Sequence, residues 1–447
     1  MKTAPQISEL DEKIQKAQAD LANAREQENA SQILFNLRRL GQLYLDSGDA
    51  PQALTHYNEA LKLVADTDDM EAHAQILGFR GVALKLIGNF SLALQSFRKS
   101  NAVASSINHA ALTCDSYIQI AMIKSEMGET TEAISNLSRA MAVAQEKNDL
   151  ARKMRIASLL GDNFYKIEAF DKAVDYSVLG SEIARELRNQ AAEVSFLTKV
   201  ANIFLLEGEI KSAVGQYERA LKIASAIEDR NAEINILGGL FRAHALDGDV
   251  RLATVYGDQV IHLARDSKHA EAEYSNIAAF ATFLAEKGKV EDAIPYLERG
   301  LQIADEQNNL DLKSDMLIRL GLAYSQQQQP AQALEKFNQA LEMTRTVSDA
   351  RTQARILGYI ASLQADAGNL QASIAAAEGA LSLAQELEIP ELMAEQQILL
   401  AFNYRDLGQI EKAVHFCKAG IASYQDIGQT ELTAQANTLL AELEDQA

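Results

Sequence analysis

Histidine, cysteine and carboxylate side chains are the groups in this chain that could bind a metal or perform catalysis. Their spacing matches no known catalytic or metal-binding motif: phosphate-loop, dinucleotide, nucleophile-elbow and His-Glu-x-x-His patterns are all missing from the sequence. The histidines do not share a ligand spacing either; they are His56, His73, His109, His244, His262, His269 and His415. We therefore predict a protein that is not an enzyme, with no cofactor and no metal site.

The two cysteines, Cys114 and Cys417, lie about 300 residues apart in the chain. A disulfide would have to join distant segments, so we expect two free thiols in a reducing compartment. No run of 18 apolar residues and no apolar leader segment occurs. These observations predict a soluble, cytoplasmic protein that is not inserted in a membrane.

Charge narrows the range of partners. The chain has 62 acidic and 42 basic residues and a formal net charge of −20. A nucleic-acid-binding protein needs a basic surface, so we predict no nucleic-acid partner. The excess carboxylates either keep the protein soluble or attract a basic partner.

Glycine recurs at a spacing of 40 residues, and this period decides the fold. Only Glu168 and Gln328 interrupt the series, and no insertion breaks it. A fixed period of this size is typical of a stacked repeat array. The glycines of the series are Gly48, Gly88, Gly128, Gly208, Gly248, Gly288, Gly368 and Gly408.

Within each unit the apolar residues follow two helical faces. If the recurring glycine is position 15, large residues fall at positions 4, 7, 11, 24 and 28, and small residues at 8, 20 and 27. The glycine supplies a left-handed turn between two helices. Polar residues near position 36 should cap the next helix: Asp69, Asp149, Asn189, Asp229, Asn309 and Asp349.

This pattern resembles the tetratricopeptide repeat. The resemblance rests on Gly or Ala at position 8, an aromatic residue such as Tyr44 or Phe164 at 11, Ala at 20, and an aromatic residue such as Tyr57 or Phe97 at 24. The 40-residue, proline-free form of the repeat is similar to those of kinesin light chains, spindle-orientation adaptors and bacterial regulators. The resemblance implies an all-α, right-handed superhelical solenoid of about ten antiparallel helix pairs, with a concave groove lined by the first helix of each pair.

The ends of the chain continue the pattern as single helices. Ile14, Leu21 and Ala24 lie one period before Leu54, Leu61 and Val64, and Leu440 and Ala441 continue positions 7 and 8. We predict a capping helix within residues 1–33, ten repeats in 34–433, and a second cap in 434–447. Polar caps favour a monomer, although end-to-end association stays open.

Positions 2, 5, 9 and 12 form the stripe of the first helix that faces the groove. Units four to seven carry small and polar residues in this stripe, where a ligand backbone could come close. We predict an extended peptide there, although tighter superhelical curvature would also explain the small residues. The proposed binding residues are Arg155, Asp162, Lys199, Asn202, Asn235 and Arg242.

A second group in the groove could bind acidic or phosphorylated segments. The alternative is pairing with the nearby carboxylates of Asp315, Asp366 and Asp406. The group consists of Arg319, Arg355, Tyr359 and Arg405.

The sequence thus predicts a non-catalytic interaction scaffold whose partner is a protein or peptide. The alternative is a sensor or regulatory module in which a ligand or peptide changes the superhelical pitch. Glu168 and Gln328, in turns that favour glycine, and Pro295, which removes a helical donor, are predicted points of local weakness.

Overall fold

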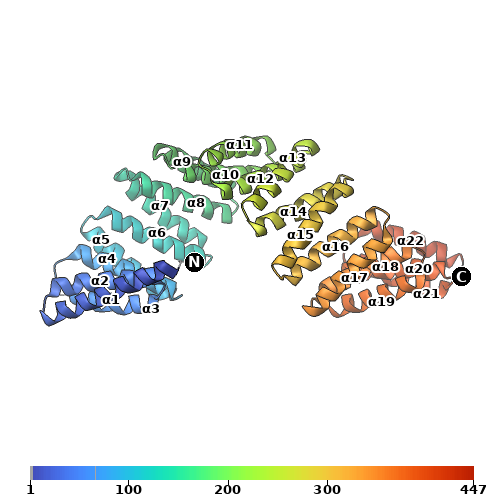
Figure 1. The fold of residues 1–447 in the computed structure, drawn as a ribbon, viewed down its shortest axis with the longest axis horizontal. Coiled ribbons are helices and arrows are strands. Elements are labelled where there is room, and N and C mark those ends of the chain that lie inside the picture. Colours follow the sequence, from blue (N-terminus) through green and yellow to red (C-terminus); the bar gives the residue numbers. More distant parts are fainter. Residues whose placement is uncertain (1–3, 66, 447) are drawn as a thin grey trace. The chain divides into compact units, whose positions relative to one another are not determined.

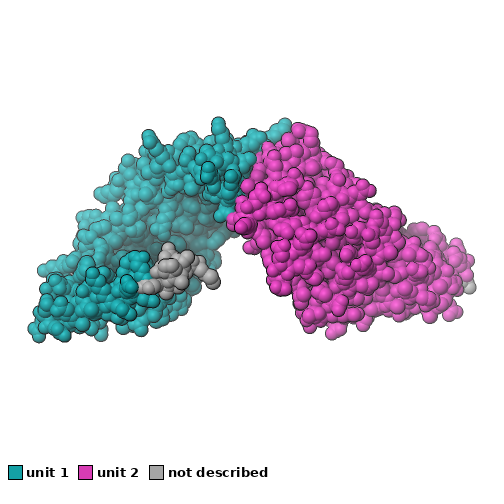
Figure 2. Space-filling model, in the orientation of Figure 1, with its two compact units in different colours: residues 1–236 teal, residues 237–447 magenta. Residues whose placement is uncertain are grey.

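A computed structural model of the chain describes residues 4–65 and 67–446. These residues form 22 α-helices joined by short turns, and the helices pack in consecutive pairs (Figure 1). Two compact units divide the chain, residues 1–236 and residues 237–447 (Figure 2). Each unit is described by itself.

The helices begin at intervals of 20 residues from α2 onward. In the first unit they are α1 (Ala4–Glu26), α2 (Ala30–Ser47), α3 (Ala50–Val64), α4 (Met70–Leu86), α5 (Phe90–Ser106), α6 (Ala110–Glu126), α7 (Thr130–Glu146), α8 (Leu150–Lys166), α9 (Phe170–Glu186), α10 (Gln190–Leu206) and α11 (Ile210–Ala226). The unit boundary falls within α12 (Arg230–Asp247).

The second unit continues the alternation. Its helices are α13 (Val250–Asp266), α14 (Ala270–Glu286), α15 (Val290–Glu306), α16 (Leu310–Gln326), α17 (Pro330–Thr346), α18 (Ala350–Asp366), α19 (Leu370–Glu386), α20 (Pro390–Asp406), α21 (Ile410–Asp426) and α22 (Thr430–Glu444).

The predicted all-α architecture of helix pairs is confirmed. Helices α2–α21 provide ten pairs, with the even-numbered helix first and the odd-numbered helix second, and α1 and α22 stand at the ends. Helix α2 begins at Ala30, so each first helix starts four residues before position 1 of the sequence numbering. The division into caps and repeats at residues 33 and 433 stays a prediction.

Residues in the left-handed backbone conformation end helices at the turns within a pair and at the turns between one pair and the next. Glu168 and Gln328 have φ values of 58° and 59°, as their place in the glycine series predicts. The amide of Glu168 donates to the Tyr165 carbonyl and that of Ala169 to the Phe164 carbonyl, both at 3.0 Å, which satisfies the last carbonyls of α8.

The sequence did not predict the second series of left-handed turns, between one pair and the next. These turns carry no glycine signal except at Gly428, because other residues adopt positive φ there. The non-glycine members are Glu28, Asn108, Asn148, Arg188, Glu228, Lys268, Asn308, Ser348 and Glu388. Backbone strain is therefore spread over many turns and is not special to Glu168 and Gln328.

All six predicted helix caps are confirmed. Each of these side chains accepts a hydrogen bond from a backbone amide in the first turn of the next helix, as Asp149 does from Arg152 at 3.0 Å. The other five bonds are those of Asp69, Asn189, Asp229, Asn309 and Asp349.

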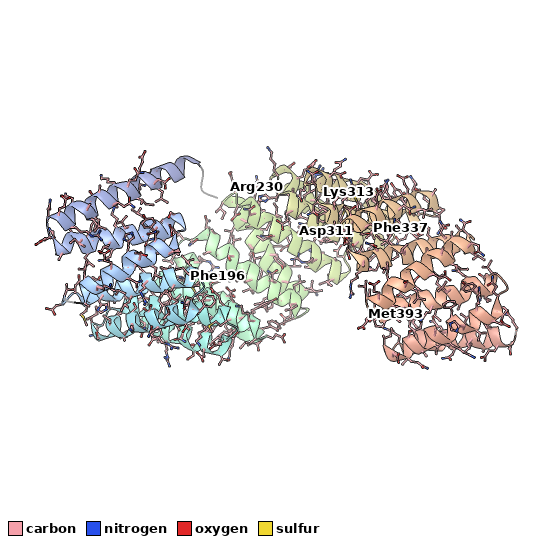
Figure 3. The ribbon with its side chains drawn as sticks, turned by 90° about the horizontal axis from the view of Figure 1, so that it is seen from below. Phe196, Arg230, Asp311, Lys313, Phe337 and Met393 are labelled. Atoms are coloured by element: carbon pink, nitrogen blue, oxygen red, sulfur yellow. The ribbon has the colours of Figure 1, made fainter. Side chains whose placement is uncertain are left out.

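Small residues at position 8 are confirmed as points of close approach. A Cβ placed on Gly321 of α16 would lie 2.5 Å from the Phe337 ring of α17 (labelled in Figure 3), so no larger residue fits without repacking. Gly41 meets Tyr57 in the same way. At position 27, where the sequence also predicts small residues, Gly180 of α9 meets the Phe196 ring of α10.

Both cysteines are buried and unpaired, as predicted. The Cys114 thiol donates to the Ala140 carbonyl at 3.5 Å, and burial raises its pKa to about 11. Cys417 donates to the Ala436 carbonyl at 3.3 Å. Among the described helices, none combines the length and apolar character that a membrane crossing requires.

One buried carboxylate cross-links three helices of the second unit. The Glu273 side chain is 3% exposed and accepts hydrogen bonds from Arg265 at 2.8 Å and from Arg299 at 2.9 and 3.1 Å. Burial alone would raise the pKa of Glu273, but the bonds from Arg299 and Arg265 outweigh it and hold the pKa below its usual value.

Replacing Glu168 or Gln328 with glycine should stabilise the local turn by about 1 kcal/mol, because glycine has no Cβ penalty at positive φ. Hydrogen exchange of amides at the α8–α9 turn should slow by about fivefold in Glu168→Gly. Glu168→Ala is the control and should bring no slowing. Equal slowing in both variants would contradict the explanation.

Removing the Glu273 carboxylate should destabilise the second unit by about 3 kcal/mol at neutral pH in Glu273→Gln, since two arginines lose a buried partner. The pKa is lower in the folded than in the unfolded chain. The carboxylate therefore stabilises the fold above the unfolded pKa, and this contribution is lost as pH falls through the folded pKa.

Urea unfolding of both proteins at stepwise lower pH measures this difference, which should shrink in acid. The matched control is Glu306→Gln, whose side chain is 64% exposed and pairs with the same Arg299. It should change stability by less than about 1 kcal/mol. A difference that does not change with pH would rule out the ionised pair as its source.

Candidate functional site

A pocket of about 560 Å³ opens between the first helices α4, α6 and α8 of unit 1. Its wall combines aromatic and aliphatic side chains with amides and charged groups. A Cβ placed on Gly78 would meet only the Ser100 hydroxyl, at 3.6 Å, so the space above this glycine is open. The lining residues are Gln75, Gly78, Phe79, Val82, Phe97, Ser100, Leu112, Asp115, Ser116, Gln119, Ala151, Arg152 and Arg155.

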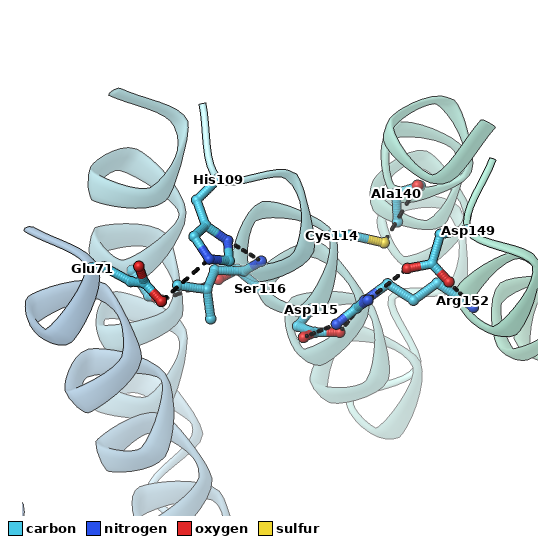
Figure 4. Close-up of polar contacts among 10 residues, drawn as sticks. Glu71, His109, Cys114, Asp115, Ser116, Ala140, Asp149 and Arg152 are labelled. Carbon is cyan, nitrogen blue, oxygen red and sulfur yellow. Dashed lines mark hydrogen bonds and ion pairs between the residues drawn. The ribbon is translucent and has the colours of Figure 1, made fainter. Parts of the chain in front are cut away.

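Two arginines on the rim of this pocket differ in their partners. Arg152 donates to both carboxylate oxygens of Asp115 at 2.9 Å and to Asp149 at 2.6 Å, so its charge is compensated (Figure 4). The hydrogen bond from the Arg152 backbone amide is the main cause that lowers the pKa of Asp149, and the bond from the Arg152 side chain is the next. Arg155 contacts the Met122 sulfur at 3.8 Å and has no carboxylate partner among the described residues.

A second pocket, of about 290 Å³, lies between α8, α9 and α10. It brings together three of the predicted binding residues, Asp162, Lys199 and Asn202. Lys199 donates to Asp162 at 2.6 Å and to the Ser158 hydroxyl at 3.0 Å. This pairing limits the attraction of Lys199 for outside acidic groups, which the sequence did not foresee.

The Asn202 amide is partly used inside the protein. Its carbonyl oxygen accepts a hydrogen bond from the Tyr217 hydroxyl, and its amide nitrogen can donate two more. Arg155 and Asp162 are seven residues apart on α8 and so lie on one face of that helix. The two pockets therefore adjoin along α8.

The remaining predicted residues lie elsewhere. Asn235 is an exposed residue of α12 in unit 1. In unit 2, Arg242 and Arg319 line one pocket of about 450 Å³, together with Ala278 and Thr282. The sequence had placed these two arginines in separate groups, yet the fold brings them together.

The second predicted group is largely bound internally. Arg319 donates to Asp315 at 2.9 Å and to Thr282 at 2.8 Å, and Arg405 donates to Asp406 at 2.9 Å, as the alternative interpretation held. Arg405 also stacks over the Phe402 ring, 5.0 Å from its centre. Arg355 donates to the Tyr359 hydroxyl at 3.2 Å, and no bond to Asp366 forms among the described residues.

Sequence reasoning missed the pocket between α4, α6 and α8, apart from Arg155. The residue in the sequence that could have indicated this pocket is Gly78, which occupies position 5 of its unit as Gly238 does. Its neighbours Phe79 and Val82 are apolar, so the sequence analysis treated this unit only as an apolar flank. Phe79 and Val82 line the pocket, Phe79 stacks on Tyr57 with ring centres 5.8 Å apart, and only the Ser100 hydroxyl lies within 4 Å of a Cβ placed on Gly78.

Comparisons with known proteins support the repeat class. The sequence profile described as Tetratricopeptide repeat matches residues 273–346. No curated protein matches the chain in sequence.

Several solved structures are similar to the chain at low sequence identity. The apo form of RapI is similar at 15% identity with a TM-score of 0.54, over 80% of this chain and 98% of that one. BtubC from P. vanneervenii is 17% identical with a TM-score of 0.45, over 51% of this chain and 93% of that one. Aspartyl phosphate phosphatase F from Bacillus subtilis is 13% identical with a TM-score of 0.47, over 80% of this chain and 94% of that one.

The fold defines an α-helical repeat solenoid built of consecutive helix pairs. Residues 273–346 match the tetratricopeptide repeat in sequence, and the helix pairs of the chain have a tetratricopeptide-like fold.

The Lys199–Asp162 pair should contribute little to stability, because its side chains are 31% and 48% exposed. A double-mutant cycle with Lys199→Met and Asp162→Asn should give a coupling energy below about 1 kcal/mol in urea unfolding. The exposed pair Lys13–Glu9 provides the reference cycle. A coupling several times that of the reference would mean that the pair is desolvated and unavailable to a ligand.

Proposed function

We propose that the chain is a non-catalytic scaffold that binds an extended segment of a partner protein along α4, α6, α8 and α10. The observation that carries this proposal is the pair of adjoining pockets that share one face of α8. Tetratricopeptide repeats typically mediate protein–protein interactions, which fits a binding role.

The two pockets suit different parts of a peptide. The pocket above Gly78 can take a bulky apolar side chain, whose burial would contribute roughly 1.5–3 kcal/mol. The Asn202 amide nitrogen can donate to a peptide carbonyl, and Asp162 can accept from a peptide amide. An extended chain has both kinds of group at regular intervals.

The proposal also includes a location in the cell and an alternative, regulatory function. The unpaired thiols of Cys114 and Cys417 are in keeping with a reducing compartment such as the cytoplasm. A module whose pitch responds to a ligand is the alternative. Small-angle scattering that changes on addition of a bound peptide would favour that alternative.

Filling the pocket above Gly78 should weaken binding without unfolding the protein. Peptides selected from a random-sequence library against the full chain should bind Gly78→Leu about tenfold or more weakly, because the leucine occupies the space of the apolar anchor. Asn202→Ala should weaken the same peptides by a smaller factor. Isothermal titration calorimetry measures each affinity.

The matched control is Gly215→Leu on α11, since a Cβ there meets nothing within 4 Å and the glycine lines neither pocket. This variant should bind as the wild type does. Selected peptides that bind Gly78→Leu with unchanged affinity would place the binding surface elsewhere.

A further inference from the structure

A separate polar pocket of unit 1 is lined by two second helices and the first helix between them. It has a volume of about 390 Å³ and is formed by α5, α6 and α7. None of its lining residues belongs to the two pockets described above. The residues that matter chemically are Arg98, Asn101, Tyr117, Ser135, Asn136 and Arg139.

The charge of this pocket is positive although the whole chain is acidic. Arg98 and Arg139 have no carboxylate partner within residues 4–65 and 67–446. The one carboxylate in the wall, Glu132, is 3.0 Å from the Lys124 ammonium, which also donates to Glu129. Two guanidinium groups therefore face the pocket without an anion to neutralise them.

Neutral donors surround these two guanidinium groups. Tyr117 and Ser135 contribute hydroxyls for which no hydrogen bond is found among the described residues. Asn101 donates to the Thr113 carbonyl at 3.2 Å and Asn136 to the Glu132 carbonyl at 2.8 Å. Each amide keeps a second N–H for a ligand.

We propose that this pocket binds a phosphoryl group, either as free phosphate or as a phosphate monoester. Such a group has about two negative charges and three or more acceptor oxygens, which matches two arginines and several neutral donors better than a single carboxylate would. Tyr117 and Ile120 provide an apolar wall against which the organic part of an ester can lie.

The negative charge of the protein does not prevent this binding. At physiological ionic strength the Debye length is about 8 Å, so remote carboxylates are screened. The guanidinium groups act on a bound anion at direct contact, where screening is weak. This inference is independent of the proposed peptide site, because the two sites have no lining residue in common, although α5 and α6 contribute to both.

The test uses inorganic phosphate and phenyl phosphate as probes in calorimetric titrations of the full chain. Arg98→Gln and Arg139→Gln should each weaken binding about tenfold or more, since each removes a charge-assisted hydrogen bond. Lys99→Gln, the exposed neighbour on α5, is the charge-matched control and should have little effect. Ser135→Glu, which adds a negative group to the wall, should abolish binding.

The pH dependence gives an independent readout. Arginine does not titrate in the accessible range, whereas the second pKa of a phosphate monoester is about 6. Affinity should therefore rise as pH increases through about 6. Circular dichroism melting should show that all four variants keep the fold.

Either probe can support the proposal. Equal binding of both probes would identify a site for the free anion, and tighter binding of phenyl phosphate a site for an ester. The proposal is wrong if neither probe binds at low salt. It is also wrong if the two arginine variants bind as Lys99→Gln does.

Discussion

The left-handed turn is the constraint on which the rest of this structure depends. A residue with positive φ follows helix after helix and lets two backbone amides bond back to the last helical carbonyls, as Glu168 and Ala169 do. The helices consequently start at a constant interval of 20 residues. This constant interval keeps corresponding faces of successive first helices in line. Pockets can therefore form between one first helix and the next.

Packing between the helices of a pair decides where these faces are open. Glycine at position 8 receives the ring of an aromatic residue, as Gly321 receives Phe337, which brings two helices close. Gly78 differs from these glycines, because no ring packs onto it and the space above it is free. The same residue type thus closes the core at one position and opens a pocket at another.

Charge pairing across neighbouring first helices defines what the pockets can bind. Lys199 with Asp162, and Arg152 with Asp115, connect successive first helices and neutralise each other. Among the described residues, Arg155 in one pocket and Arg98 and Arg139 in another have no such partner, and the two proposals for ligand binding depend on these arginines. In an acidic chain, the position of a few unpaired cations matters more than the net charge.

The sequence by itself determined the helix pairs, the caps and the glycine turns, because each depends on a residue and its near neighbours. Of the six residues that it predicted as one binding group, the fold brings three together in one pocket, namely Asp162, Lys199 and Asn202. Only the tertiary structure decided which charges are paired, that Arg242 and Arg319 share a pocket, and that Gly78 lies under an open one. These features depend on side chains from helices that start 40 or 80 residues apart in the chain, and no local pattern specifies their contacts.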